Sequence, residues 1–318
     1  IAGYWLDGVV AVSPNIFPGE GGRPLYDVAT EAALLMPCAL LAPAFDDEPL
    51  ARLGGLKPPA WGVRCATLAQ AGVLQGADMA AQAADAYARL REGGWNDEAL
   101  AAGALSVGFD LWRAVAVPYA SAYSRTGPYD MPCGYGYAVI GGDGQPMAPR
   151  VADQAAWWSD ASGLPPGQGV AILDALAADA PQADSALPGL RCLRGLWADG
   201  TVQGRRLREG VEATRARAPQ RGLPILVVHG LADGLGPAAH TAEPYVAWAR
   251  EGGADVHYWP LPRAQHFDAF LGLPGLGGRY QPLMPVAWQA LDALLAHLED
   301  GQAIPDAPRG GSRAGARE

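Results

Sequence analysis

The sequence predicts an α/β fold in which a parallel sheet is interrupted by a large, mainly helical insertion. Three apolar runs carry this prediction, because short runs ended by turn residues are typical of buried parallel strands. They lie at Leu6–Val12, Pro224–Val228 and Ala254–Trp259. Between the first and the second run, over residues 17–221, helical periodicity dominates, which indicates a cap inserted between strands of the sheet.

The first predicted strand, Leu6–Val12, is followed by Ser13, Pro14 and Asn15, residues that favour a turn. The few residues before this strand resemble the end of a helix. The chain is therefore expected to open in the middle of a strand–helix repeat, and residues 1–16 are assigned to the core that contains the sheet.

The insertion at residues 17–221 is expected to consist of helices separated by joints rich in glycine and proline. A lone strand is expected at Tyr135–Ile140, where a glycine-rich turn follows. The predicted helices are Asp27–Met36, Arg64–Ala71, Ala77–Arg91, Glu98–Ala116, Asp153–Ser159, Leu187–Trp197 and Arg205–Arg217. Aromatic residues of the insertion, Phe109 among them, are expected mostly in its core, and some could line an apolar acyl pocket.

The alternation of strands and helices returns over residues 222–300, which are assigned to the core again. Helices are expected at His240–Glu251 and Met284–Leu298, each after one of the two late strands. Residues 301–318 are rich in proline, glycine, arginine and alanine, so a disordered tail is expected there.

The composition excludes several classes of protein. The chain has 318 residues, of which 50% are hydrophobic and 18% charged, so it can bury a sizeable core and is not expected to be disordered. The net charge of −10 and the absence of a basic stripe argue against nucleic acid as a partner. The most apolar stretch, Leu34–Phe45, is too short to span a membrane and contains two prolines.

Four cysteines, Cys38, Cys65, Cys133 and Cys192, lack the spacing of a metal site. An even number permits two disulfides, which would place the protein in the periplasm or outside the cell. Four buried thiols are the alternative. The sequence leaves both possibilities open, and it does not indicate how the cysteines would pair.

Two polar residues follow consecutive late strands. Asp233 lies in the loop after Pro224–Val228, and His266 lies in the loop after Ala254–Trp259. Because the carboxyl ends of parallel strands meet at one edge of a sheet, the two side chains are expected to come together. A carboxylate can orient an imidazole, whose pKa near neutrality suits it to take and return a proton. A turn aspartate and a structural histidine are the alternatives.

The order of the two residues indicates a particular kind of enzyme. In α/β-hydrolases the catalytic triad runs serine, acid, histidine along the chain, and Asp233 and His266 fit the last two places. The serine should lie on a strand–turn–helix elbow before the first strand. The sequence holds no such elbow, so the N-terminal strands and the nucleophile elbow are expected to lie upstream of Ile1 and to be missing here.

Other candidates fit less well. Ser106 has an elbow-like neighbourhood but lies within a predicted helix, and Ser13 is followed directly by a proline that opposes a turn into a helix. His229 is expected to position the acid loop. No metal site is expected, because the residues considered for one contain no HExxH-like pair: His229, Asp233, His240 and His266.

The segments around the two residues resemble the D-(−)-3-hydroxybutyrate oligomer hydrolases. Leu226–Leu235 resembles the acid region of this family, and the longer run Ala264–Leu276 around the histidine is the more distinctive match. Shorter similarities occur at Asp7–Ala11, Pro14–Asn15, Met36–Leu40 and Tyr119–Arg125.

The resemblance implies a serine ester hydrolase that cleaves 3-hydroxybutyrate dimers and oligomers to monomers in poly(3-hydroxybutyrate) degradation, and that is secreted or periplasmic. It implies Asp233 as the acid, His266 as the base, no cofactor and a nucleophilic serine shortly before Ile1. Without that serine the chain is expected to be a fragment of the active enzyme. The alternatives are another α/β-hydrolase esterase or peptidase, and a non-catalytic binding module derived from a hydrolase.

Overall fold

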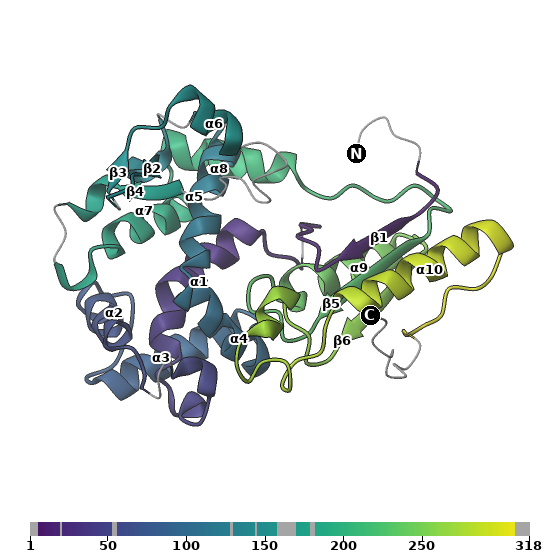
Figure 1. Ribbon diagram of the computed structural model, residues 1–318, viewed down its shortest axis with the longest axis horizontal. Helices are drawn as coiled ribbons and strands as arrows, with labels where there is room; N and C mark the ends of the chain where they lie inside the picture. The colour runs from purple at the N-terminus through teal and green to yellow at the C-terminus, as the bar shows by residue number, and fades with distance from the viewer. Residues whose placement is uncertain are drawn as a thin grey trace.

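The computed structural model describes residues 6–19, 21–52, 56–127, 130–143, 145–157, 170–178 and 182–308. Figure 1 shows a large helical part, coloured purple to teal, beside a smaller part that holds a sheet and two helices. The chain starts in the sheet, passes through the helical part and returns to the sheet. The structure is thus a mixed α/β arrangement, as the sequence predicts.

The smaller part is built on a parallel sheet with the strand order β1-β5-β6. β5 (Ile225–Gly230) is the central strand and is buried along its whole length, in keeping with its continuous apolar run. β6 (Val256–Leu261) pairs with it from Ile225↔Val256 onwards. Both late strands are therefore confirmed, with ends displaced by one or two residues from the prediction.

The first strand is shorter than predicted and lies at one edge of this sheet. β1 covers Val9–Val12, is half-buried, and pairs with β5 alone among the described residues. The N–H of Val9 donates to the carbonyl oxygen of Pro224, just before β5, and that of Ser13 donates to Val228 of β5. Backbone groups alternate in direction along a strand. The N–H groups of Val10 and Val12 therefore point to the second edge, where the described chain provides no strand.

A helix covers each face of the parallel sheet. α9 (Ala242–Glu251) buries Tyr245 and Val246 against one face. α10 (Met284–Asp300) buries Leu294 against the other. Each aliphatic side chain buried in this way contributes roughly 1.5–3 kcal/mol. The three-layer arrangement holds the carboxyl ends of β5 and β6 in a fixed position.

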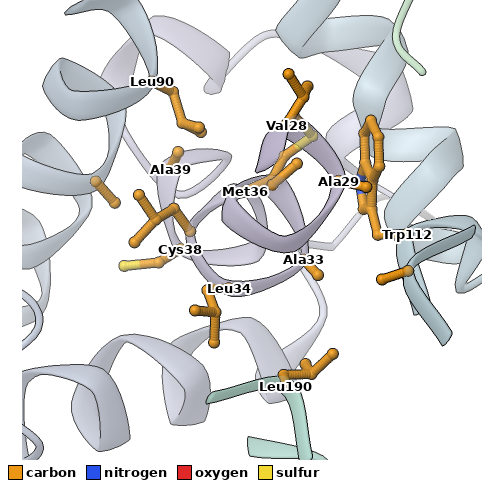
Figure 2. Close-up of a cluster of buried hydrophobic side chains, with 14 of the residues drawn as sticks. Val28, Ala29, Ala33, Leu34, Met36, Cys38, Ala39, Leu90, Trp112 and Leu190 are labelled. Carbon is orange, nitrogen blue, oxygen red and sulfur yellow. The ribbon is translucent and has the colours of Figure 1, made fainter. Parts of the chain in front are cut away.

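The helical part is organised around α1 (Leu25–Ala39), of which every residue except Glu31 is buried. A helix that is buried on nearly all sides belongs at the centre of a core. Figure 2 shows Leu90, Trp112 and Leu190 directed at α1 from three neighbouring helices. The helices that pack on α1 are α2 (Pro59–Gln70), α3 (Met79–Glu92), α4 (Asp97–Gly108), α5 (Leu111–Ser124) and α7 (Leu187–Ala198), while α8 (Val202–Ala213) packs on α5 and α7.

The predicted single helix Glu98–Ala116 is wrong, because the structure has two helices there. α4 ends before Phe109, and Asp110 adopts a left-handed conformation with φ of 53° that starts α5. Aspartate is one of the few residues besides glycine that tolerates this conformation. In the described part of the chain no single helix is long and apolar enough to cross a membrane. α4 and α5 meet that test only as a pair, which is bent by 79°.

The predicted strand Tyr135–Ile140 has the expected bounds, but it is not alone. As β2 it forms an antiparallel sheet with β3 (Pro146–Met147) and β4 (Val170–Asp174). β3 is too short to give a periodic signal, and β4 pairs with β2 only because the chain folds back. α6 is Val151–Trp157, and the last residues of the helix predicted at Asp153–Ser159 lie outside the described residues.

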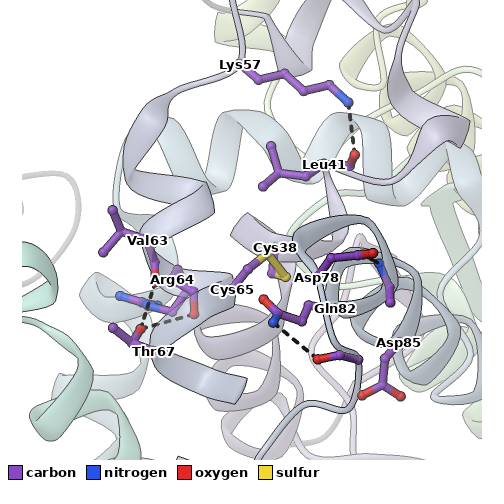
Figure 3. The surroundings of a disulfide bond; sticks show 12 residues. Cys38, Leu41, Lys57, Val63, Arg64, Cys65, Thr67, Asp78, Gln82 and Asp85 are labelled. Carbon is purple, nitrogen blue, oxygen red and sulfur yellow. Dashed lines mark hydrogen bonds between the residues drawn. A yellow bond between two sulfur atoms is a disulfide. The ribbon is translucent and has the colours of Figure 1, made fainter. Parts of the chain in front are cut away.

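All four cysteines form disulfides within the helical part. Cys38 of α1 bonds to Cys65 of α2, with their Cα atoms 5.0 Å apart (Figure 3). Cys133, just before β2, bonds to Cys192 of α7 across 5.7 Å. Both distances suit disulfide geometry. Of the two possibilities that the sequence leaves open, the structure has the disulfides and no free thiol.

Residues 301–308, which belong to the predicted tail, instead contact the sheet through Ile304 and Pro305. Ile304 is buried against the sheet, and the carbonyl oxygen of Pro305 accepts a hydrogen bond of 2.8 Å from Nε1 of Trp259. A buried indole N–H needs an acceptor, and this contact holds residues 301–308 against β6. Residues 309–318 of the predicted tail lie outside the described residues.

Candidate active site

The carboxylate of Asp233 is held by its own loop. This loop follows β5, and the side chain is completely buried. The backbone N–H groups of Leu235 and Gly236 donate to Oδ1 over 2.9 and 2.7 Å. This turn, in which an aspartate caps its own backbone, is a common local structure. It fixes the orientation of the carboxylate and leaves Oδ2 for other partners.

His266 reaches that second oxygen from the loop after β6. Its Nδ1 lies 2.8 Å from Oδ2 of Asp233, and 27% of its side chain remains exposed. An ionised carboxylate only accepts hydrogen bonds, so Nδ1 carries the hydrogen, and in the neutral ring Nε2 is left as a proton acceptor. The structure thus brings together the two residues that the sequence singled out.

His229, at the end of β5, contacts the same carboxylate. Its Nε2 lies 3.4 Å from Oδ2 of Asp233 and 2.9 Å from the carbonyl oxygen of Gly236. Both neighbours are acceptors, so this nitrogen carries a hydrogen and joins the two ends of the acid loop. The ring is completely buried, which leaves it no access to a ligand. This geometry agrees with the positioning role expected for His229.

The negative charge of Asp233 and the positive charge of protonated His266 stabilise each other. Burial by itself favours the neutral form of Asp233, but the positive charge of protonated His266 and hydrogen bonds from both histidines outweigh it. They hold the pKa of Asp233 well below its ordinary value. For His266, burial lowers the pKa, yet the charge of Asp233 and the hydrogen bond to it prevail and raise the pKa above 6.5. Asp233 is therefore ionised at neutral pH, and its charge favours the protonated form of His266.

The helical part supports the acid loop from the other side. Oγ of Ser106, on α4, donates to the carbonyl oxygen of Gly234 over 2.8 Å. Nδ2 of Asn96 donates to the carbonyl oxygen of Leu231 over 3.1 Å. The elbow-like neighbourhood of Ser106 in the sequence does not correspond to an elbow in the structure. Ser106 lies inside a helix and is buried, where it acts as a donor to the loop.

Two further candidates are Ser13 and His240. Ser13 follows β1 with a φ of 39°, and its buried Oγ has no hydrogen-bond partner among the described residues. His240 contacts the carbonyl oxygen of Gly93 through Nε2, and burial lowers its pKa. Within the described residues no group of three or more His, Cys, Asp or Glu side chains is arranged to hold a metal ion.

Comparison with protein families identifies the chain. A family model described as 3HB-oligomer hydrolase (3HBOH) matches residues 8–318. The chain belongs to the 3HB-oligomer hydrolase family. The resemblance inferred from the segments around Asp233 and His266 is thereby confirmed.

Several relatives within the 3HB-oligomer hydrolase family are named D-(-)-3-hydroxybutyrate oligomer hydrolase. The protein from Paracidovorax citrulli is 36% identical over 96% of this chain and 50% of its own length. The protein from Cupriavidus necator is 34% identical over 98% of this chain and 48% of its own length. The chain therefore spans about half the length of these relatives. The search of solved structures found no match.

In this chain, sequence reasoning missed the aromatic surroundings of His266. The ring of Phe267 meets His266 edge to face, and Phe270 packs against Phe267. Their spacing of one and four residues from His266 is a local signal that could have been noticed. Phe109, in the helical part, stacks on Phe270. The two residues are far apart in sequence, so no local sequence pattern predicts this contact.

Proposed function

We propose that this chain supplies the acid, Asp233, and the base, His266, of a serine ester hydrolase that cleaves 3-hydroxybutyrate oligomers to monomers. The observation that carries the proposal is the hydrogen bond between these residues at the carboxyl ends of two neighbouring parallel strands. The substrate is taken from the names of the relatives. Residues 1–16 and 222–300 would form an α/β-hydrolase-like core, and residues 17–221 its cap.

The proposed reaction is acyl transfer. Nε2 of His266 takes the proton of the serine hydroxyl while the serine oxygen attacks the ester carbonyl carbon, and Asp233 stabilises the imidazolium. Backbone N–H groups hold the oxyanion. His266 then gives the proton to the departing alcohol oxygen, which leaves an acyl-enzyme. A water molecule, deprotonated by His266, attacks this ester and releases the hydroxyacid and the serine.

The nucleophilic serine is proposed to lie on a segment that this chain does not contain. Three observations support this. The relatives are about twice as long as the part that matches. The second edge of β1 is apolar on both faces and unpaired in the described chain, although exposed edges of this kind are usually protected. A cavity of about 710 Å³ lies beside β1 on the side of α9, and its lining combines the apolar side chains of Val9, Ala11 and Tyr245 with polar ones such as Arg215 and Arg217.

One serine of the chain itself competes for this role. Ser13 lies at the carboxyl end of β1, which is the strand beside the acid strand, and its positive φ is unusual for a residue other than glycine. The proline that follows it removes a backbone N–H where an oxyanion donor is usually placed. In a fusion of this chain with the N-terminal half of a relative, Ser13→Ala is therefore expected to keep the release of 3-hydroxybutyrate, and loss of that release would assign the nucleophile to Ser13.

We further propose that the protein works in an oxidising compartment, either secreted or periplasmic. The two disulfides support this, because such bonds persist outside the reducing cytosol. Mass spectrometry of the protein from its native host would show both disulfides if the proposal holds, and free thiols if it does not.

The decisive experiment fuses this chain behind the N-terminal half of the Cupriavidus necator relative and measures release of 3-hydroxybutyrate from its dimer and trimer. We expect release by the fusion, none by this chain alone, and a loss of at least about 10³-fold in the His266→Ala fusion. Cleavage of a chromogenic peptide without release of 3-hydroxybutyrate would favour a peptidase. Binding of oligomers without any hydrolysis by the fusion would favour a non-catalytic module.

A further inference from the structure

A row of aromatic rings leads away from His266. The ring centroids of His266 and Phe267 are 4.6 Å apart, those of Phe267 and Phe270 are 5.2 Å apart, and those of Phe270 and Phe109 are again 5.2 Å apart. The first two pairs meet nearly edge to face, whereas Phe270 and Phe109 are stacked within 11° of parallel. We call Phe267, Phe270 and Phe109 the aromatic strip.

The strip is assembled from both parts of the molecule. Phe267 and Phe270 belong to the loop and short 3-10 helix after β6, and both are half-buried. Phe109 lies at the corner between α4 and α5, where the left-handed Asp110 turns the chain. Phe267 packs on the core of the helical part, so the inner end of the strip is anchored there. The strip therefore crosses the seam between the cap and the loop that carries His266.

The outer end of the strip is open to solvent. Phe109 is 55% exposed, and Leu273, which follows the 3-10 helix, is 38% exposed. Single exposed apolar side chains are common on protein surfaces and need no explanation. Phe109 differs because its ring continues a row of rings that begins at the proposed catalytic base. Beside it, Asp110 and Arg113 form an ion pair, so their opposite charges offset each other at this end.

The chemistry of the proposed substrate suits such a surface. An oligomer of 3-hydroxybutyrate repeats an uncharged ester unit with a methyl branch, and it carries a charge only at its acid end. Methyl and methylene groups gain dispersion energy and lose contact with water when they lie on aromatic faces. Several rings in a row offer such contacts to successive units of one chain.

We propose that the aromatic strip is a substrate subsite, which binds the part of the oligomer that extends from the ester held at His266. This inference rests on the proposed function and adds to it the residues that distinguish long from short substrates. Units that reach Phe109 add affinity. The dimer, which extends less far, gains little from Phe109, and the monomer leaves readily.

The proposal is tested by binding, because this chain can be used as it exists. Isothermal titration calorimetry would give the Kd of the 3-hydroxybutyrate dimer and tetramer for the unmodified chain and for Phe109→Ala. Phe109 is exposed, so its removal should leave the fold intact. We expect the Kd of the tetramer to rise about fivefold or more and that of the dimer to change less than about twofold. Phe109→Leu should recover part of the loss.

A matched control removes an exposed aromatic side chain elsewhere. Trp288, on α10, is 60% exposed, and Trp288→Ala should leave both Kd values unchanged. Tetramer binding should also shift the NMR signals of the His266 ring, which places the ligand beside the base.

Three results would contradict the proposal that the aromatic strip is a substrate subsite. They are equal tetramer affinity in Phe109→Ala, an equal loss in Trp288→Ala, and no binding of the tetramer by the unmodified chain. Each would leave the proposed hydrolysis to be judged separately, by the release of 3-hydroxybutyrate from the fusion protein.

Discussion

Nε2 of His229 lies 3.4 Å from Oδ2 of Asp233, which is also the oxygen bound by His266. Two histidines, one at the end of β5 and one in the loop after β6, thus share one buried oxygen atom. His266 is partly exposed and faces the proposed chemistry, whereas His229 is buried and also holds Gly236. The pair Asp233–His266 is therefore supported by a third residue that touches no substrate and acts through the carboxylate.

Replacing His229 by alanine should weaken this support. The change leaves the carbonyl oxygen of Gly236 without its donor and removes one hydrogen bond to Asp233, so we expect a loss of about 1–3 kcal/mol in the free energy of unfolding. The pKa of His266 should fall, because a looser carboxylate stabilises its charge less well. NMR titration and urea unfolding would measure both effects. His257→Ala, which removes another histidine paired with an aspartate, is the control and should leave the pKa of His266 unchanged.

Replacing Asp233 by asparagine should lower the pKa of His266 from above 6.5 to below it. Burial alone lowers this pKa, and in the variant no negative charge opposes the effect. NMR titration of the His266 ring would measure the shift. An unchanged pKa would mean that Asp233 does not stabilise the charge of His266.

The same pair makes stability depend on pH, with opposite signs for its two members. The raised pKa of His266 gives a contribution that is fully present below about pH 6.5 and is lost as the pH rises through the folded-state pKa. The lowered pKa of Asp233 gives a contribution that is present above about pH 4 and is lost as the pH falls. Urea unfolding across this range should show both losses in the unmodified chain and smaller losses in Asp233→Asn, in which other carboxylates, such as that of Asp27, still contribute to the loss at low pH.

The close approach of α4 to the acid loop requires glycine at position 234. A Cβ atom there would lie 2.4 Å from the backbone nitrogen of Gly103 and 2.5 Å from the carbonyl carbon of Ala102. Gly234→Ala should therefore destabilise the protein by about 3 kcal/mol, as severe overpacking does. Gly236→Ala is the matched control in the same loop, because nothing lies within 4 Å of its Cβ. It should stay within about 0.5 kcal/mol of the unmodified chain in urea unfolding.

The disulfides should stabilise the helical part. The bond between Cys38 and Cys65 closes a loop with a sequence separation of 27, so its loss in the Cys38→Ala/Cys65→Ala variant should cost about 3 kcal/mol. Calorimetry should record a Tm roughly 5–10 °C lower. The bond between Cys133 and Cys192 spans 59 residues, and its removal should cost slightly more. An unchanged Tm after full reduction of the unmodified chain would contradict both expectations.

Much of the sheet and of the candidate site was predictable from local sequence. The continuous apolar run of β5 and the turn residues after it are local features, so the strand and the loop that presents Asp233 follow from them. The same holds for the loop of His266 and for the bounds of β2. The meeting of Asp233 and His266 could be inferred because neighbouring parallel strands end at one edge of a sheet.

Contacts between distant segments were decided by the tertiary structure. The pairing of Cys133 with Cys192, the partnership of β4 with β2 and the stacking of Phe109 on Phe270 join residues with no shared local pattern. The break at Asp110, which exposes Phe109, also escaped the helical periodicity around it. Periodicity and turn chemistry thus determined the strands, most helices and the two polar residues of the site. The side chains that surround Asp233 and His266 depended on how the cap packs against the sheet. Packing depends on the complementary shapes of side chains, and the spacing of residues along the chain does not reveal it.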